Sequence, residues 1–170
     1  NLGVILQQLG KLEEAEASYR RAVVLKPDYA GCHNNLGNAL RELGRLNEAE
    51  ASLRQSIALN PHVAHVHYNL GVTLKELNRL SEAEASHRQA IALQHDYAEA
   101  HCNVGLIFYE DGRIGEAIAS MRQAIASKPG FNEAYNNLGA MLRELGKLDE
   151  AEVNLRRAIA LQADNADPHN

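Results

Sequence analysis

The sequence has no tryptophan and only two phenylalanines, four prolines and two cysteines among its 170 residues. Alanine, leucine, glutamate, arginine and asparagine dominate it instead. Because proline interrupts helices and most of the abundant residues form them readily, this composition favours helix over strand. We therefore expect an all-α fold, and the 45% hydrophobic content is enough to bury a core in a chain of this length.

The sequence also lacks a basic patch and a long apolar run. Its formal net charge is −5, and lysine and arginine occur singly or in pairs, which argues against DNA or RNA as a partner. No apolar run approaches the roughly 20 residues that a membrane-spanning helix needs. We therefore expect a soluble, cytoplasmic protein that binds neither nucleic acid nor a membrane.

A 34-residue repeat runs through the whole sequence. It is clearest in a glycine that recurs, without any insertion, at Gly3, Gly37, Gly71, Gly105 and Gly139. The pattern predicts a single array over residues 1–170. Its copies cover residues 30–63, 64–97, 98–131 and 132–165, with a truncated copy over 1–29 and the start of a further copy at 166–170.

Each copy has the pattern of a helical hairpin. In residues 30–63, two helical patterns of about a dozen residues each flank the turn Gly44-Arg45-Leu46. A second break follows at Asn60-Pro61. We expect the second helix to begin at an N-cap residue with glutamate three positions later, as at Asn47, Ser81 and Asp149.

The spacing of residues within a copy is similar to that of a known family. A Leu-Gly pair, a turn glycine, an alanine, a large residue, a small residue and a proline follow one another as Leu36-Gly37, Gly44, Ala49, Leu53, Ser56 and Pro61. This pattern closely resembles the tetratricopeptide repeat over essentially the whole chain. Asn78 replaces one turn glycine, which is compatible because asparagine tolerates a left-handed backbone. The resemblance implies an all-α, right-handed α-α superhelix, or solenoid, of antiparallel helical hairpins whose first helices line a concave groove.

One arc of each first helix need not be buried. At about 100° per residue, the second copy places six residues on this arc, namely Gly31, Asn34, Asn35, Asn38, Arg41 and Glu42. One position on the arc is asparagine in all five copies: Asn1, Asn35, Asn69, Asn103 and Asn137. Asparagine costs about 0.5 kcal/mol relative to alanine inside a helix, so its recurrence suggests a compensating use.

The asparagine column suggests recognition of a polypeptide backbone. A carboxamide can accept a hydrogen bond from a peptide N–H and donate one to a peptide C=O. The repeat region of O-linked N-acetylglucosamine transferases carries a similar asparagine ladder, and this sequence resembles that region. In a competing interpretation, each asparagine caps or bridges neighbouring repeats. The varied residues beside the ladder either select a partner sequence or form a solvated helix face; they include Arg41, Tyr68, Lys75, Tyr109 and Arg143.

The sequence shows no catalytic motif. It contains no phosphate loop, nucleophile elbow, metalloprotease helix or closely spaced cysteine pair. His65 and His67 are two residues apart on a helix and so point away from each other, which argues against a metal site. We expect inward positions for His33, His67 and His101. We also expect helical ion pairs between the recurring arginines of the second helices, except Arg122, and a glutamate four residues earlier. We predict no enzyme, no cofactor and no metal.

We therefore predict a protein-interaction scaffold that binds an extended polypeptide segment in the groove. The predicted binding residues are Asn1, Asn34, Asn35, Asn38, Arg41, Tyr68, Asn69, Lys75, Asn103, Tyr109, Asn137 and Arg143. Two alternatives remain open. The array could recruit substrates for a larger glycosyltransferase, or it could assemble with itself through uncapped ends. The protein or peptide partner is not identified by the sequence.

Overall fold

The computed structural model describes residues 2–166, with side chains for residues 2–163, and these residues form only helices, turns and short connections. The ten helices in this range are α1 (Leu2–Gln8), α2 (Leu12–Leu25), α3 (Ala30–Glu42), α4 (Leu46–Leu59), α5 (Ala64–Glu76), α6 (Leu80–Leu93), α7 (Ala98–Glu110), α8 (Ile114–Ser127), α9 (Asn132–Glu144) and α10 (Leu148–Ala166). The prediction of an all-α fold is confirmed. None of the described helices is both long and apolar enough to cross a membrane.

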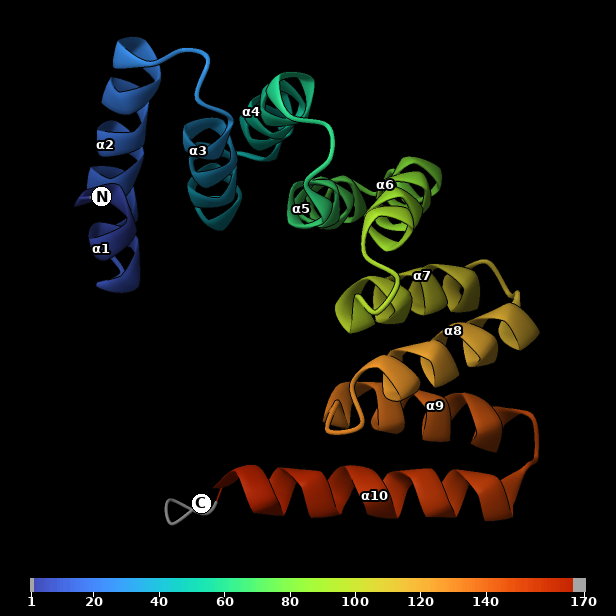
Figure 1. Ribbon diagram of the computed structural model, residues 1–170. Helices are drawn as coiled ribbons and strands as arrows, with labels where there is room; N and C mark the ends of the chain where they lie inside the picture. The colour runs from blue at the N-terminus through green and yellow to red at the C-terminus, as the bar shows by residue number, and fades with distance from the viewer. Residues whose placement is uncertain (1, 167–170) are drawn as a thin grey trace. The chain divides into compact units, whose positions relative to one another are not determined.

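The chain divides into two compact units. The first covers residues 1–93 and contains α1–α6, and the second covers residues 94–170 and contains α7–α10. Within each unit, every helix packs most extensively against its hairpin partner, as α3 does against α4 and α9 against α10 (Figure 1). The hairpins then stack, with α2 on α3 and α4 on α5 in the first unit and α8 on α9 in the second. The continuation of one array through both units stays a prediction.

The hairpin turns depend on a left-handed residue. Gly10, Gly44, Gly112 and Gly146 all have φ of 73°, and Asn78 takes the same place with φ of 59°. The expectation that Asn78 substitutes for a turn glycine is confirmed. In this conformation Gly44 N–H reaches Arg41 O, and Arg45 N–H reaches Leu40 O, both at 2.8 Å, so the turn satisfies carbonyls at the end of α3.

The predicted N-caps are wrong. The second helices begin at Leu46, Leu80 and Leu148, so Asn47, Ser81 and Asp149 are already second residues of their helices. The N-cap of α4 is Arg45, whose side chain makes no cap hydrogen bond. The turn brings the backbone into the helix directly, since Ala49 N–H already bonds Arg45 O at 3.0 Å. The first turn of α4 therefore forms without a side-chain cap.

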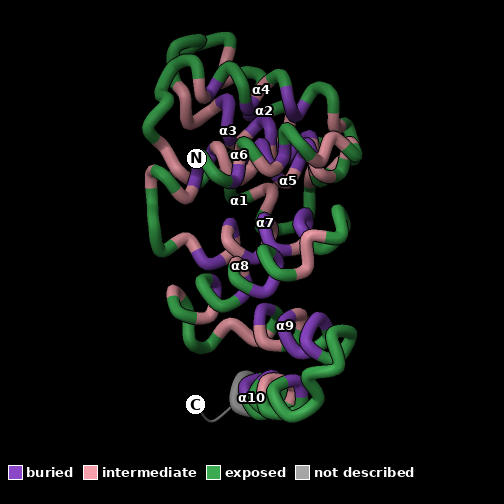
Figure 2. The backbone as a smooth tube through the Cα atoms, turned by 90° about the vertical axis from the view of Figure 1, so that its right-hand side faces the viewer, coloured by how far each residue is buried: buried purple, intermediate pink, exposed green. Residues whose placement is uncertain are grey.

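A close helix crossing explains the recurring glycine. A Cβ atom added at Gly37 would lie 2.7 Å from Leu53 Cγ and 3.2 Å from the backbone oxygen of Ala49. At Gly105 in the second unit, a Cβ would lie 2.9 Å from Met121 Cε. In both units, the first helix therefore requires glycine where it faces a large residue of the second helix. Figure 2 shows the resulting pattern, with buried stretches on the helices and exposed residues in the connecting loops.

Candidate functional site

The candidate site lies on the first helices of the hairpins. We call it the first-helix face and treat its two halves separately. The half in the first unit contains Asn34, Asn35, Asn38 and Arg41 from α3 and Tyr68, Asn69 and Lys75 from α5. The half in the second unit contains Asn103 and Tyr109 from α7 and Asn137 and Arg143 from α9. The predicted site residue Asn1 lies outside the described residues.

Three carboxamides of the first unit are joined by hydrogen bonds. Asn69 Nδ2 donates to Asn34 Oδ1 at 3.0 Å, and Asn34 Nδ2 donates to Asn35 Oδ1 at 3.3 Å. Asn35 and Asn69 are half-buried, as a partly accessible ladder would require. Asn34 is only 6% exposed, so the expectation that it lies on the accessible arc is wrong. It is buried because Asn69 on the next first helix packs against it.

Asn38 has a different environment. Its side-chain oxygen is enclosed, and no described residue donates a hydrogen bond to it. A buried polar atom without a partner costs about 1–3 kcal/mol. Local packing alone therefore gives no reason for an amide at this position, and the enclosed oxygen is not accessible to a ligand in this conformation.

In the second unit, a thiol takes the place of Asn34. Asn137 Nδ2 donates to Cys102 Sγ at 3.8 Å, and Cys102 is 2% exposed. The pairing repeats the geometry of Asn69 and Asn34, because both partners are 35 residues apart. Sulfur is a weaker acceptor than an amide oxygen. Asn103 is half-buried and has no hydrogen bond to the described part of the chain.

The charged residues beside the ladder are largely paired along the stack. Gln7 Nε2 donates to Glu42 Oε1 at 2.7 Å, and Arg41 Nη1 donates to Glu76 Oε1 at 2.9 Å. These pairs again join residues 35 positions apart on successive first helices. Glu42 and Glu76 therefore bridge successive repeats of the first unit.

The second unit has one further bridge of this type. Tyr109 Oη donates to Glu144 Oε2, and this hydrogen bond raises the pKa of the phenol. Arg143 is exposed and forms no ion pair within the described side chains. Of the predicted selectivity residues, Arg41 and Tyr109 are thus engaged in bridges between repeats, whereas Arg143 presents its charge to solvent.

Tyr68 and Lys75 lie near a buried histidine that the sequence analysis missed. The ring of Tyr68 lies 5.4 Å from that of His87, which is 0% exposed, and neither nitrogen of His87 has a hydrogen-bond partner in residues 2–166. Burial, and to a smaller extent the charge of Lys75, lower the pKa of His87 from 6.5 to about 4. A signal was available, because His87 occupies the repeat position of Leu53 and Met121, both of which are buried.

Three further histidines and four of the recurring arginines make local contacts. The ring nitrogen Nε2 of His33 donates to Pro27 O at 2.8 Å, and those of His67 and His101 donate to Pro61 O at 2.8 Å and His95 O at 2.9 Å. These rings therefore hold the loops that precede their helices. The predicted ion pairs are confirmed at distances of 2.6–2.9 Å for Arg20–Glu16, Arg54–Glu50, Arg88–Glu84 and Arg156–Glu152.

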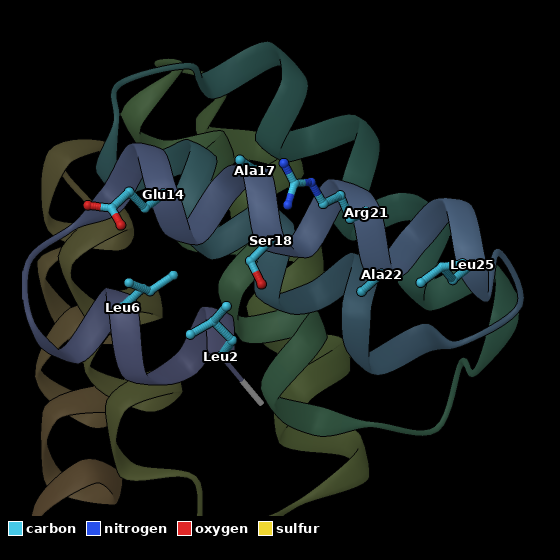
Figure 3. A pocket seen from close by; sticks show the side chains of 8 residues that line it. All are labelled: Leu2, Leu6, Glu14, Ala17, Ser18, Arg21, Ala22 and Leu25. Carbon is cyan, nitrogen blue, oxygen red and sulfur yellow. The ribbon is translucent and has the colours of Figure 1, made fainter.

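A cavity of about 460 Å³ lies between α1 and α2 (Figure 3). Leu2 and Leu6 line it from α1, and the lining from α2 is Glu14, Ala17, Ser18, Arg21, Ala22 and Leu25. One copy later, the equivalent residues Leu36 and Leu40 are 5% and 1% exposed, in the cluster where α2 packs on α3. The cavity therefore lies on a surface of the kind that packs against another hairpin. No group of three potential metal ligands occurs in the described region.

Two family models match the chain along almost its whole length. A model described as TPR repeat matches residues 3–40, 37–78 and 73–112, and one described as Tetratricopeptide repeat matches residues 102–168. No curated protein matches the chain. The resemblance noted in the sequence is therefore supported at the level of the family.

Solved structures share the fold. The chain is 26% identical to MamA, with 98% of this chain and 97% of MamA covered and a TM-score of 0.87. It is 24% identical to YrrB, described as a TPR protein with an unusual peptide-binding site, over 96% of this chain and 84% of YrrB, with a TM-score of 0.75. It is 23% identical to PilW, a type IV pilus biogenesis factor, over 95% and 75%, with a TM-score of 0.86. The matched repeats and the stacked hairpins show that the chain belongs to the tetratricopeptide repeat family and is a protein-interaction scaffold of that type.

Proposed function

We propose that the chain binds an extended segment of a partner polypeptide on the first-helix face, chiefly through the ladder asparagines. The observation that carries the proposal is the unused hydrogen-bonding capacity of these amides. Asn35 Nδ2 and Asn69 Oδ1 have no hydrogen-bond partner in the described part of the chain, although both residues are half-buried. A peptide backbone offers a donor and an acceptor that complement these groups.

The bridging interpretation is compatible with this proposal. The bridge from Asn69 uses one N–H of its amide, and the bridge from Asn137 does the same. A primary amide has two N–H donors and a carbonyl with two lone pairs, so each keeps further capacity. Asn69 and Asn137 therefore link successive repeats and still have amide atoms available to a ligand.

Charged residues beside the ladder are paired with one another, so we do not expect them to select a partner strongly by its charge. Arg41 and Glu76 neutralise each other, and the Glu144 carboxylate accepts from Tyr109. Recognition would depend mainly on the partner's main chain, with Arg143 and the ring of Tyr68 adding local selectivity. The peptide-binding site described for YrrB supports this kind of use for the shared fold. The proposal assigns the chain no catalytic step, and no observation favours the glycosyltransferase alternative.

A peptide selection tests the proposal. Random dodecamer peptides displayed on phage are selected on the immobilised chain, and the affinity of an enriched peptide is measured by calorimetry. We expect the combined change Asn35→Ala, Asn69→Ala and Asn103→Ala to weaken binding at least about tenfold, because several backbone hydrogen bonds are lost. The matched control is Asn47→Ala with Asn154→Ala, which removes two asparagines from the second helices.

The outcome is decisive if both variants keep the helical circular dichroism signal of the parent. Equal affinity for the ladder variant and the parent would rule out the ladder as the binding element. Failure to enrich any peptide above an unrelated helical protein would contradict the proposal as a whole.

A further inference from the structure

We infer that Asn34 is a positioning residue that orients the ladder amides on either side of it, so that the first unit presents a fixed donor on α3 and a fixed acceptor on α5. The inference rests on the proposed function and deepens it, because it assigns a direction to the bound peptide. Asn34 itself is buried and would not touch the peptide.

Both ends of the Asn34 amide are occupied. Its oxygen accepts from Asn69 Nδ2 at 3.0 Å, and its nitrogen donates to Asn35 Oδ1 at 3.3 Å. The three amides therefore form a head-to-tail chain in which every link runs from N–H to C=O. Water cannot substitute for a lost link at a residue only 6% exposed, so a reversed Asn34 amide would place N–H against N–H and oxygen against oxygen. While Asn35 and Asn69 keep their orientations, this orientation of Asn34 is therefore favoured over its reverse.

The orientation of Asn34 in the structure sets that of the outer ends of the chain. Because the oxygen of Asn35 faces Asn34, its NH₂ group remains for a ligand carbonyl. Because one N–H of Asn69 faces Asn34, its oxygen remains for a ligand N–H. Neither remaining group has a partner among the side chains and backbone of residues 2–166. The first-helix face of this unit thus presents a donor on one helix and an acceptor on the next.

This arrangement fits an extended peptide in one direction. Packed helices lie about 8–10 Å apart, and an extended chain advances about 3.3 Å per residue. A carbonyl bonded by Asn35 and an N–H bonded by Asn69 would therefore belong to peptide units about three residues apart. A peptide running the opposite way would have to place its donors and acceptors differently, which gives the face a preferred polarity.

The second unit supplies an internal comparison. There Cys102 occupies the position of Asn34, and the contact from Asn137 to its sulfur is 3.8 Å long. A thiol accepts weakly, so it orients the neighbouring amide less firmly than a second amide does. The difference between Asn34 and Cys102 therefore predicts that directional preference resides in the first unit.

The test replaces Asn34 and measures the peptide selected on the parent chain. In Asn34→Asp the residue can only accept, so Asn69 keeps its bond while Asn35 turns its NH₂ group inward and presents its oxygen. We expect the affinity of the selected dodecamer to fall about tenfold, the loss of one oriented hydrogen bond. Asn136→Asp is the matched control, because it places the same charge at the same repeat position on an exposed residue of α9.

A second variant covers the case in which a buried carboxylate unfolds the hairpin. Asn34→Cys copies Cys102 with little change in volume, and we expect a loss of at least about threefold because one orienting bond is weakened. Hydrogen exchange of the side-chain NH₂ groups, followed by NMR without peptide, should be slower for Asn34 and Asn69 than for Asn103 in the parent.

The outcomes separate the inference from the proposed function. Parent-like affinity in folded Asn34→Cys overturns the positioning role and leaves peptide binding intact. Equally fast exchange for all three amides would show that Asn34 and Asn69 are not held in the hydrogen-bonded chain. If the parent itself binds no dodecamer, both the inference and the proposed function fall.

Discussion

The two units share one repeat pattern but differ at buried positions that the pattern leaves open. In the first unit His87 lies opposite Gly71, whereas in the second Met121 lies opposite Gly105, and both side chains are fully buried. Glu50 of the first unit is likewise replaced by Ile118 of the second. In these two pairs of equivalent positions, the first unit has a polar side chain and the second an apolar one.

This comparison separates the shared frame from the variable chemistry. The glycine crossing and the left-handed turn recur in both units, so they define the hairpin. Within the same hairpin frame, one buried position accepts either the imidazole of His87 or the thioether of Met121. Another accepts either the carboxylate of Glu50 or the alkyl side chain of Ile118. We expect changes to the frame to destabilise either unit, and changes to the variable positions to alter pH or salt dependence.

The largest expected effect comes from filling a crossing that both units share. Gly37→Leu would force the side chain into Leu53 and the backbone of Ala49, where even a Cβ lies 2.7 Å and 3.2 Å from its neighbours. Overpacking of this kind typically costs about 1–3 kcal/mol and more where backbone must move, so we expect a loss of at least about 3 kcal/mol. Urea unfolding monitored by circular dichroism measures it.

Gly115 provides the control in the second unit. It lies in α8, and a Cβ there would meet nothing within 4 Å. Leucine forms helices better than glycine by up to about 1 kcal/mol, so Gly115→Leu should leave stability unchanged or slightly raised. A Gly37→Leu variant as stable as Gly115→Leu would contradict the close crossing.

The next largest effect concerns the pH dependence of stability, which we expect His87 to influence and Met121 not to influence. His87 is neutral when folded, with its pKa lowered by burial from 6.5 to about 4. The unfolded chain therefore binds more protons between these values, and the stability present above pH 6.5 is lost progressively as pH falls towards 4. At about pH 5, His87→Met should be more stable than the parent by about 2 kcal/mol beyond any difference at neutral pH.

Thermal melts of the parent and His87→Met at neutral and acidic pH test this prediction. Met121→Leu serves as the control, because it changes the same repeat position of the second unit without adding or removing a titrating group. Parallel pH dependence in the parent and His87→Met would show that His87 does not contribute to acid sensitivity.

The sequence allowed the frame to be predicted better than the variable chemistry. The spacing of Gly37 and its equivalents encodes helix packing directly, and the φ of Asn78 follows from its place in the turn. The N-caps failed because local preference at Asn47 competes with backbone hydrogen bonds of the turn, which start the helix at Leu46.

The candidate site was only partly accessible to sequence reasoning. Periodicity placed the ladder asparagines on one arc, but it could not show that Asn69 meets Asn34. That contact depends on how successive first helices align, which makes residues 35 apart neighbours although the repeat is 34 residues long. Likewise, periodicity predicts burial at His87 but not the lack of partners for its ring nitrogens.

The smallest expected effect concerns Glu50 and Ile118. Glu50 is 7% exposed and accepts from Arg79 Nη1 at 2.7 and 2.8 Å, and its Oε1 lies 2.9 Å from Arg54 Nη2. Ile118 has no such role, and Lys147, which corresponds to Arg79, pairs only with Glu150 at 3.7 Å in the described region. The same interface is therefore held by an ion-pair network in one unit and by apolar contact in the other.

Exchanging the two residues should exchange the salt dependence with little change in stability. Replacing buried ion pairs by apolar side chains of similar volume is often nearly neutral, and Arg79 keeps its pairing with Glu82, so we expect Glu50→Ile to cost about 1 kcal/mol or less. In about 1 M salt, where the screening length is about 3 Å, the remaining difference should shrink.

Ile118→Glu should show the opposite change, because the new carboxylate can pair with Arg122 and Lys147. Urea unfolding of both variants at low and high salt measures this, and identical salt responses in the parent and both variants would mean that the network of the first unit contributes no more to stability than the apolar contact of the second.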